Sequence, residues 1–256
     1  MNVKSMEGIT VQGIILQSVP QGEYDKRMVI LTKEKGKVTV FARGARRAKN
    51  AFAGKTNPFS FGTFVLGTGS SAYYLKQADI SNYFADMTSD YEKSCYGFYF
   101  LEFAEYYSRE ECDGTGLLAL VYQTLRALEK GTISYSLIRI IFELKIFAIN
   151  GEYPEVFHCM KCKRKLEEGY FYAKKGGVLC PGCRMGLPGE LYIEGASLYT
   201  LQYIISTEVR KLYTFTVTSP VLNNLQRIMA DYCLHYVDRE FKSLEVLEEL
   251  HAMDVR

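Results

Sequence analysis

Residues 28–47 read MVILTKEKGKVTVFARGARR, and the architecture of the amino-terminal part of the chain can be inferred from this stretch outward. β-branched and other apolar residues are dense on both sides of Glu34-Lys35-Gly36, which is the pattern of two strands joined by a tight hairpin. Gly36 supplies the positive φ that such turns often need. The pattern therefore predicts an antiparallel pair, with one strand over 28–32 and the other over 37–43.

Three further runs of the same kind surround this hairpin, at 11–17, 61–67 and 72–78, and Gly, Pro, Asn or Ser residues separate them. Five short strands within residues 1–80 suit a small barrel. Among small barrels, the five-stranded OB-fold combines a basic groove with aromatic platforms for single-stranded nucleic acid. We therefore expect residues 1–80 to form an OB-fold domain that binds nucleic acid.

The charge of the chain supports this expectation once it is divided by position. The total is only +2, from 31 basic and 29 acidic residues, but residues 1–80 hold 12 basic and 5 acidic residues, a net +7, and the rest carries −5. Residues 33–49 alone contain seven basic residues and one acidic residue. Such density near aromatic side chains favours a polyanion-binding edge over an ordinary solvated surface. The nearby aromatic residues are Tyr24, Phe41, Phe52 and Phe59, of which Phe41 and Phe59, taken singly, are better explained as barrel core.

Four of the seven cysteines form two CxxC pairs, Cys159 with Cys162 and Cys180 with Cys183, and seventeen residues separate the pairs. Two such knuckles bring four thiolates within reach of one tetrahedral Zn²⁺, and the separation is usual for a zinc ribbon. Because four thiolates close the coordination shell, we expect one structural zinc ion per chain and not a catalytic one. The other three cysteines show no partner spacing and are expected to pack as small apolar residues.

A helical period begins at about residue 86. Helices are predicted over 86–109, 117–130 and 134–149, and residues 191–256 are predicted to be helical as well, with 221–240 the longest piece. The expected fold class is α+β and multidomain. It comprises the OB-fold barrel at 1–80, a helical bundle domain made of 81–156 and 191–256, and a four-cysteine, zinc-ribbon-like insertion at 157–190.

The sequence carries few signs of enzyme chemistry. No P-loop, HExxH, GxSxG or Rossmann glycine pattern occurs. Glu240 and Lys242 resemble one half of a nuclease metal motif, but a nuclease places its first acid on an upstream strand and this piece is expected to be a helix end. We expect no catalytic residues. Two alternatives stay open at this point: a zinc-ribbon transcription or translation factor, and a metal-dependent nuclease.

The compartment can also be predicted. The first twenty residues lack an apolar run followed by a small-residue cleavage site, and no stretch approaches the ~18 consecutive apolar residues of a membrane span. We therefore expect a cytoplasmic protein without a membrane partner.

The order of these parts resembles the RecO family of bacterial recombination mediators and DNA repair proteins, over nearly the whole chain. Residues 31–47, LTKEKGKVTVFARGARR, resemble the family's second and third strands. Further resemblances lie at Asn57-Pro58-Phe59, Phe142-Glu143-Leu144, Gly151 with Tyr153-Pro154, GGVLC at 176–180, and Phe241-Lys242-Ser243-Leu244.

The resemblance implies a non-enzymatic protein that binds single- and double-stranded DNA (ssDNA and dsDNA) and anneals complementary strands. It further implies that the protein helps load RecA onto ssDNA coated with single-stranded-DNA-binding protein (SSB), in the RecF-type repair pathway. The implied partners are DNA, RecR, the acidic C-terminal tail of SSB and, indirectly, RecA. The implied location is the bacterial cytoplasm, in association with the nucleoid.

Candidate residues follow from the charge pattern. Contacts to DNA phosphates, without sequence readout, are expected from Lys35, Lys37, Arg43, Arg46, Arg47, Lys49 and Lys55. An acidic partner tail needs a cation beside an apolar pocket, and the candidates in the helical region are Arg126, Lys130 and Arg139.

Overall fold

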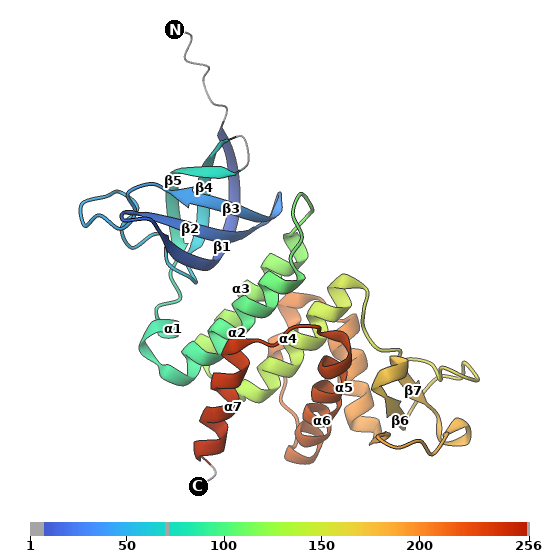
Figure 1. Ribbon diagram of the computed structural model, residues 1–256. Coiled ribbons are helices and arrows are strands. Elements are labelled where there is room, and N and C mark those ends of the chain that lie inside the picture. The colour runs from blue at the N-terminus through green and yellow to red at the C-terminus, as the bar shows by residue number, and fades with distance from the viewer. Residues whose placement is uncertain (1–7, 70–71, 255–256) are drawn as a thin grey trace. The chain divides into compact units, whose positions relative to one another are not determined.

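A computed structural model describes residues 8–69 and 72–254 of the chain, with side chains up to Leu250 (Figure 1). The chain divides into two compact units. The barrel unit comprises Met1–Glu129 and Phe241–Arg256, and the cysteine unit comprises Lys130–Glu240. The three-domain division expected from the sequence stays a prediction. The first seven residues, part of the segment searched for a targeting signal, lie outside the described residues. Within the described part, no helix is both long and apolar enough to span a membrane.

Five strands close a barrel in the order β1-β2-β3-β5-β4. Neighbouring strands are antiparallel except β3 and β5, which pair in parallel. The predicted α+β class and five-stranded barrel are therefore confirmed, and each predicted strand run overlaps one of the observed strands. These are β1 (Gly8–Gln21), β2 (Asp25–Thr32), β3 (Gly36–Ala42), β4 (Phe61–Thr68) and β5 (Tyr73–Asn82).

Strand β3 shows how the sequence builds the barrel wall. Buried and half-buried residues alternate along it, so that Val38 and Val40 point into the core while Lys37, Thr39 and Phe41 point outward. Gly36 begins the strand at φ +61°, and a Cβ there would lie 2.2 Å from the carbonyl oxygen of Arg109. Only glycine fits this turn because both the backbone angle and the close approach exclude a side chain.

The helices of the barrel unit are α1 (Asp86–Ser89), α2 (Tyr91–Tyr107), α3 (Thr115–Lys130), whose last residue is counted with the cysteine unit, and α7 (Lys242–Asp254). The single helix predicted over 86–109 is wrong, because Asp90 leaves the helical conformation at φ −118° and ψ 123°. Its carboxylate accepts the N–H of Lys93 at 2.9 Å, which caps the start of α2. Helix α2 then packs on the barrel wall, where the rings of Phe98 and Phe59 lie 4.8 Å apart.

The cysteine unit combines helices with a small sheet in the order β7-β6-β8. Residues 191–193, predicted to be helical, form strand β8, and helix α6 stops at Tyr236, so residues 237–240 do not continue it. The ring of Tyr232 on α6 joins helix to sheet, at 5.0 Å from Phe147 and 6.0 Å from Phe171. The elements are α4 (Tyr135–Asn150), β6 (Gly169–Tyr172), η1 (Ala173–Lys175), β7 (Gly177–Leu179), η2 (Pro181–Cys183), β8 (Leu191–Ile193), α5 (Gly195–Ser206), η3 (Val209–Thr214) and α6 (Ser219–Tyr236).

Candidate nucleic-acid interface and metal centre

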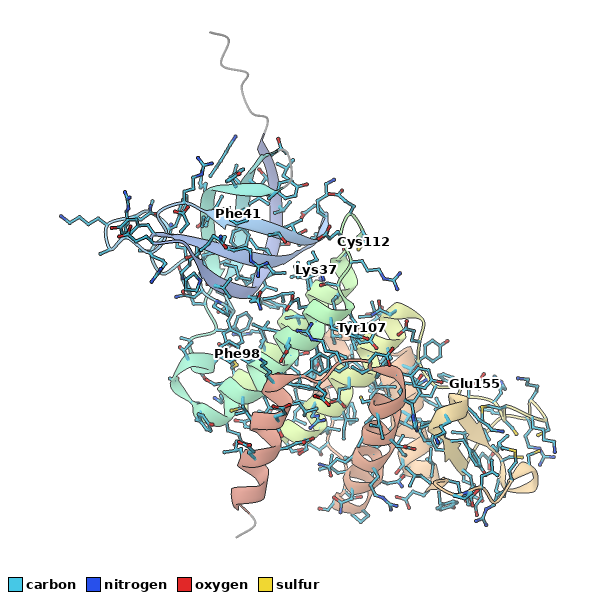
Figure 2. The ribbon with its side chains drawn as sticks, viewed as in Figure 1. Lys37, Phe41, Phe98, Tyr107, Cys112 and Glu155 are labelled. Atoms are coloured by element: carbon cyan, nitrogen blue, oxygen red, sulfur yellow. The ribbon has the colours of Figure 1, made fainter. Side chains whose placement is uncertain are left out.

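The basic residues predicted to contact DNA extend from the β2–β3 hairpin into the loop between β3 and β4. Lys37 lies at the hairpin end of β3 and Phe41 lies further along the same strand (Figure 2). The loop is held against the β1–β2 turn, because the Asp25 carboxylate accepts the N–H of Gly44 at 2.7 Å and the Arg46 guanidinium donates to the Glu23 carbonyl at 3.0 Å. The exposed cations of this loop are Arg43, Arg46, Arg47 and Lys49, whereas Lys35, Lys37 and Lys55 are half-buried.

Most of these cations keep their charge available. The Lys37 ammonium donates to the carbonyl oxygen of Glu105 at 3.1 Å, and that of Lys55 donates to the carbonyl of Ala78 at 3.2 Å. A carbonyl is neutral, so these hydrogen bonds position the lysines without cancelling their charge. Over the described residues, Lys35 is the one member of the predicted set that forms an ion pair, with Glu111 at 2.7 Å.

Two of the arginines lie over aromatic rings. The guanidinium carbon of Arg43 is 4.7 Å from the ring centre of Tyr74, and that of Arg47 is 4.4 Å from the ring centre of Tyr24. The ring of Tyr74 is in turn 6.1 Å from the ring of Phe41, its neighbour across the parallel β3–β5 pair. This surface therefore presents flat aromatic and guanidinium groups among its positive charges.

These positions refine the sequence interpretation of the aromatic residues. Phe59 is 1% exposed and belongs to the core, as expected. The core interpretation of Phe41 is wrong, because its side chain is on the outward side of β3 and is half-buried. Sequence reasoning missed Tyr74 altogether. Tyr73 and Tyr74 are adjacent, and the parallel register that pairs Tyr74 with Phe41 comes from the tertiary fold.

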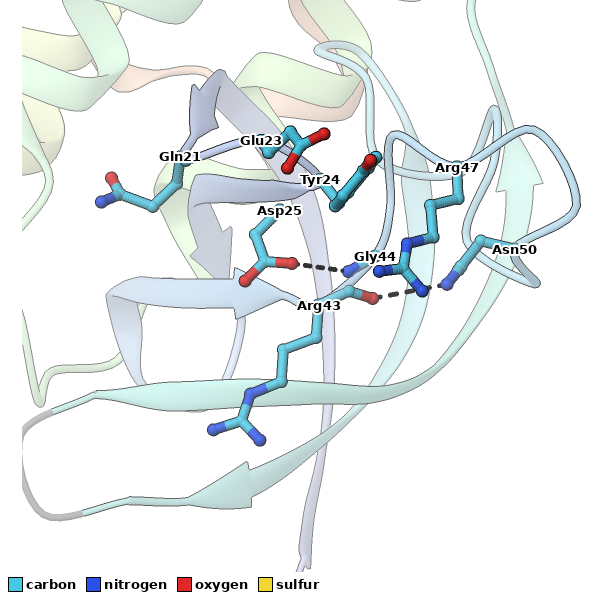
Figure 3. A pocket seen from close by; sticks show the side chains of 9 residues that line it. Gln21, Glu23, Tyr24, Asp25, Arg43, Gly44, Arg47 and Asn50 are labelled. Carbon is cyan, nitrogen blue, oxygen red and sulfur yellow. Dashed lines mark hydrogen bonds between the residues drawn. The ribbon is translucent and has the colours of Figure 1, made fainter.

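A pocket of about 450 Å³ opens beside the basic loop (Figure 3). Asp25 and Gly44 are hydrogen-bonded along its wall, and the Asn50 amide donates to the carbonyl of Arg43 at 3.4 Å. The pocket lining therefore combines a tyrosine, two arginines, acidic residues and amides, which suits a flat polar ligand. Its lining residues are Gln21, Gly22, Glu23, Tyr24, Asp25, Arg43, Gly44, Arg47 and Asn50.

The four cysteines of the two CxxC pairs come together in the cysteine unit. Their sulfur atoms all lie within 4.8 Å of one another, and those of Cys162 and Cys180 are 3.7 Å apart. Metal–sulfur bonds of about 2.3 Å in a tetrahedron place the sulfurs about 3.8 Å apart, so this arrangement fits one metal ion. In the part of the chain that the structure describes, no other group of three or more His, Cys, Asp or Glu residues is close enough to hold a metal.

Short turns and backbone amides build this centre. In the first knuckle, the Cys159 N–H donates to the Arg164 carbonyl at 2.8 Å, and Lys163 takes a positive φ of 60°. The second knuckle is the 3-10 helix η2, in which the Cys183 N–H donates to the Cys180 carbonyl at 2.9 Å. The N–H of Cys180 also points at the Cys159 sulfur, at 3.4 Å, which joins the two knuckles.

The local electrostatics favour thiolate at one of these sulfurs. Burial raises the pKa of Cys159. Hydrogen bonds from the amides of Cys162, Cys180 and Lys161 lower it, and together they outweigh the effect of burial and bring the pKa to about 6. The negative charge around Cys162 and Cys180 also raises the pKa of Arg164. The exposed Arg164 guanidinium thus offsets part of the charge of the sulfur cluster.

The three residues predicted to bind a partner's acidic tail have different surroundings. Arg126 donates to Glu129 at 2.9 Å, and Lys130 is the exposed last residue of the same helix, α3. Arg139, on α4, donates to the buried carboxylate of Glu143 at 2.6 Å. Arg126 belongs to the barrel unit, whereas Lys130 and Arg139 belong to the cysteine unit. Tail binding by these residues stays a prediction.

Comparison with known proteins matches both parts of the chain to one family. The model of the recombination protein O N terminal matches residues 6–84, and that of the recombination protein O C terminal matches residues 88–245. The DNA repair protein RecO of Alkaliphilus metalliredigens is 28% identical over 244 residues, 94% of this chain and 99% of the relative. The proteins of the same name from Acetivibrio thermocellus and Clostridium perfringens are 28% and 29% identical over 96% and 92% of this chain, and over 98% and 96% of their own lengths.

Proposed function

The chain belongs to the recombination protein O family, and from that premise we propose that it is a non-enzymatic DNA-binding mediator of recombinational repair. It binds ssDNA and dsDNA, anneals complementary strands and helps load RecA onto ssDNA covered by SSB. The family supports a role in DNA repair, and the barrel surface supports the mode of binding.

The observation that carries this proposal is the set of exposed cations on the barrel. Arg43, Arg46, Arg47 and Lys49 project from one loop, and no carboxylate of the described residues lies within ion-pair distance of them. Such charges attract phosphates of any sequence and release condensed counterions on binding. Annealing requires that the repulsion between two strands be screened, which a basic surface does without chemistry at a reacting bond.

The four-cysteine centre is proposed to hold one structural zinc ion. Four thiolates are soft ligands that close a tetrahedral shell, and they leave no open position for a reacting group. The zinc would cross-link the two knuckles and so stabilise the fold of the cysteine unit. Its ligands would be Cys159, Cys162, Cys180 and Cys183.

The protein partners are proposed to be RecR and the acidic C-terminal tail of SSB. Replacing the exposed Lys130 tests tail binding most directly, because the other two candidates, Arg126 and Arg139, already form ion pairs with carboxylates of the chain. A Lys130→Glu variant should bind the tail peptide more weakly than the wild type in a fluorescence anisotropy titration. Equal affinity of the two proteins would remove Lys130 from the proposed site.

Annealing of complementary oligonucleotides precoated with SSB tests the function. The protein should accelerate annealing with or without added divalent metal, and it should leave both strands uncut. Four to six neutralised phosphates predict a slope of about −3 to −4 for log K of ssDNA binding against log salt concentration. A slope near zero, or cleavage of the strands on addition of Mg²⁺ or Mn²⁺, would contradict the proposal.

Matched charge changes locate the surface. Replacing Arg46 and Lys49 with Gln should weaken binding to all DNA sequences alike and reduce the steepness of the salt slope by about 0.7 per lost phosphate contact. Replacing the equally exposed Lys174 and Lys175 of the cysteine unit removes the same charge elsewhere and serves as the control.

A further inference from the structure

We propose that two aromatic–arginine pairs on the barrel, Tyr74 with Arg43 and Tyr24 with Arg47, form a track on which unpaired DNA bases stack. The pairs would bind bases, whereas the surrounding cations bind phosphates. The inference rests on the proposed function, because it assigns the part of single-stranded DNA that each group contacts.

The first station of the track is built by the parallel pairing of β3 with β5. Phe41 and Tyr74 are partners in that register, and their rings are 6.1 Å apart at an angle of 36°. Both side chains are half-buried, so each keeps part of its ring accessible. The Arg43 guanidinium, 4.7 Å from the Tyr74 ring centre, extends this platform with a second flat group.

The second station lies at the β1–β2 turn. Tyr24 is 42% exposed there, so part of its ring is open to a ligand. The Arg47 guanidinium lies 4.4 Å from its ring centre, and both side chains line the pocket of about 450 Å³. The Asp25 carboxylate and the Asn50 amide line the same pocket and can form hydrogen bonds with the edge of a base.

Arg43 connects the two stations. Its guanidinium lies over the ring of Tyr74. Its backbone faces the pocket that holds Tyr24 and Arg47, where its carbonyl accepts from the Asn50 amide (Figure 3). Both stations are therefore on one continuous surface of the barrel, and the exposed Arg46 and Lys49 of the same loop lie close to them in sequence. A strand that follows this surface can place bases on the rings and phosphates on the cations.

This arrangement would let the protein bind ssDNA in preference to dsDNA. Every base has a π-face, and stacking on an aromatic side chain contributes about 1–3 kcal/mol per base without sequence preference. In a duplex the base faces are already stacked on one another inside the helix, so the tyrosine rings cannot stack on them. Phosphate contacts are available in both forms of DNA. The track therefore confers preference for single strands on a surface whose charges alone would not distinguish them.

Leucine and phenylalanine replacements test the track. Tyr24→Leu and Tyr74→Leu keep apolar bulk but remove the ring, and each should weaken binding of an oligo-dT strand about tenfold, which corresponds to about 1.4 kcal/mol. Binding of a blunt duplex should change less than twofold. Tyr24→Phe and Tyr74→Phe keep the ring and should restore wild-type affinity for both forms of DNA. Tyr24 is in an exposed turn, so its replacement tests the proposal even if the Tyr74 variant is unstable.

Two further measurements report stacking directly. The chain contains no tryptophan, so Tyr24→Trp or Tyr74→Trp introduces a unique fluorophore at the proposed contact. Its emission should be quenched by oligo-dT, and much less by an abasic strand with the same number of phosphates. The wild type should bind the abasic strand more weakly than oligo-dT, and the Leu variants should have lost most of that difference.

The outcomes separate this inference from the proposed function. If the Leu variants lose affinity for ssDNA and dsDNA by the same factor, or lose none, or if the tryptophan is not quenched, the base track is wrong while DNA binding stands. If the wild type binds neither form of DNA, the proposed function itself fails.

Discussion

The ammonium of Lys35 donates to a carboxylate oxygen of Glu111 at 2.7 Å, and the Tyr73 hydroxyl reaches the other oxygen at 3.4 Å. This contact ties the β2–β3 hairpin to the segment between α2 and α3. The backbone follows the same path, since the N–H of Lys37 donates to the Arg109 carbonyl at 2.8 Å. Glu111 thus holds, within the chain, a cation that the sequence predicts for a DNA phosphate.

Removing the charge of Glu111 should therefore strengthen DNA binding. In Glu111→Gln the neutral amide no longer cancels the charge of Lys35. One more cation of the surface therefore becomes available to bind a DNA phosphate. We expect tighter ssDNA binding at low salt and a salt slope steeper by about 0.7. Isothermal titration at several salt concentrations measures both quantities. Replacing Lys35 and Glu111 together with Gln removes both charges of the pair and should change affinity little. A loss as large as that of Arg46→Gln would show that Lys35 already contacts DNA despite Glu111.

The same pair predicts a pH dependence. The hydrogen bond from Lys35 lowers the pKa of Glu111 below its ordinary value of 4.5, while partial desolvation opposes this shift. The carboxylate is therefore more than half ionised at pH 4.5 and becomes protonated as the pH falls through the lowered pKa. The wild type and Glu111→Gln should differ in DNA affinity from neutral pH down to that range and converge below it. Convergence already at pH 6 would contradict the pairing, and Glu111→Gln controls for other titrating groups.

The sequence predicts the hairpin and the clustering of the four cysteines well because both depend on local spacing. The hairpin follows from the β-rich runs on either side of Gly36, and the four-cysteine group follows from two CxxC turns that can be read directly. The strand β8 of three residues escapes detection, since so short a segment has no measurable periodicity.

The contacts that determine which groups of the candidate DNA surface are available could not be predicted from the sequence. Lys35 and Glu111 are 76 residues apart, and nothing in the neighbourhood of either residue marks it as paired. Tyr74 becomes part of the candidate surface only through its parallel register with Phe41. Charge runs therefore locate a binding region, whereas tertiary pairing decides which of its cations are free and which rings lie beside them.

Loss of one ligand should release the metal. Cys159 is a fully buried member of the sulfur group, so Cys159→Ser replaces a thiolate by a hydroxyl that is a poor ligand for a soft site. We expect about one zinc per chain in the wild type and much less in the variant, by elemental analysis of the purified proteins. Thermal unfolding of the variant should begin earlier, and addition of a chelator should shift the wild type in the same direction.

A matched cysteine provides the control for this experiment. Cys112 is exposed in the barrel unit and its thiol contacts the Arg109 carbonyl at 3.2 Å, far in sequence from the two knuckles. Cys112→Ser should keep the full metal content and wild-type stability. A wild type without metal, or a Cys159→Ser variant with unchanged zinc content, would rule out the assigned ligands.

Lys145 is a buried cation that stabilises the end of a helix. Its ammonium donates to the carbonyls of Ile204, Ile205 and Thr207 at 3.2, 2.8 and 2.7 Å, which caps the carboxyl end of α5. Burial lowers the pKa of Lys145, so desolvation offsets part of this gain. Lys145→Met keeps the apolar stem of the side chain but removes the ammonium, so the three carbonyls lose their donor. The variant should therefore have a free energy of unfolding about 3 kcal/mol lower than the wild type. Urea denaturation measures this change, with the exposed Lys174→Met expected to stay within about 0.5 kcal/mol of the wild type. Equal stability of the two variants would mean that water satisfies the end of α5 as well as Lys145 does.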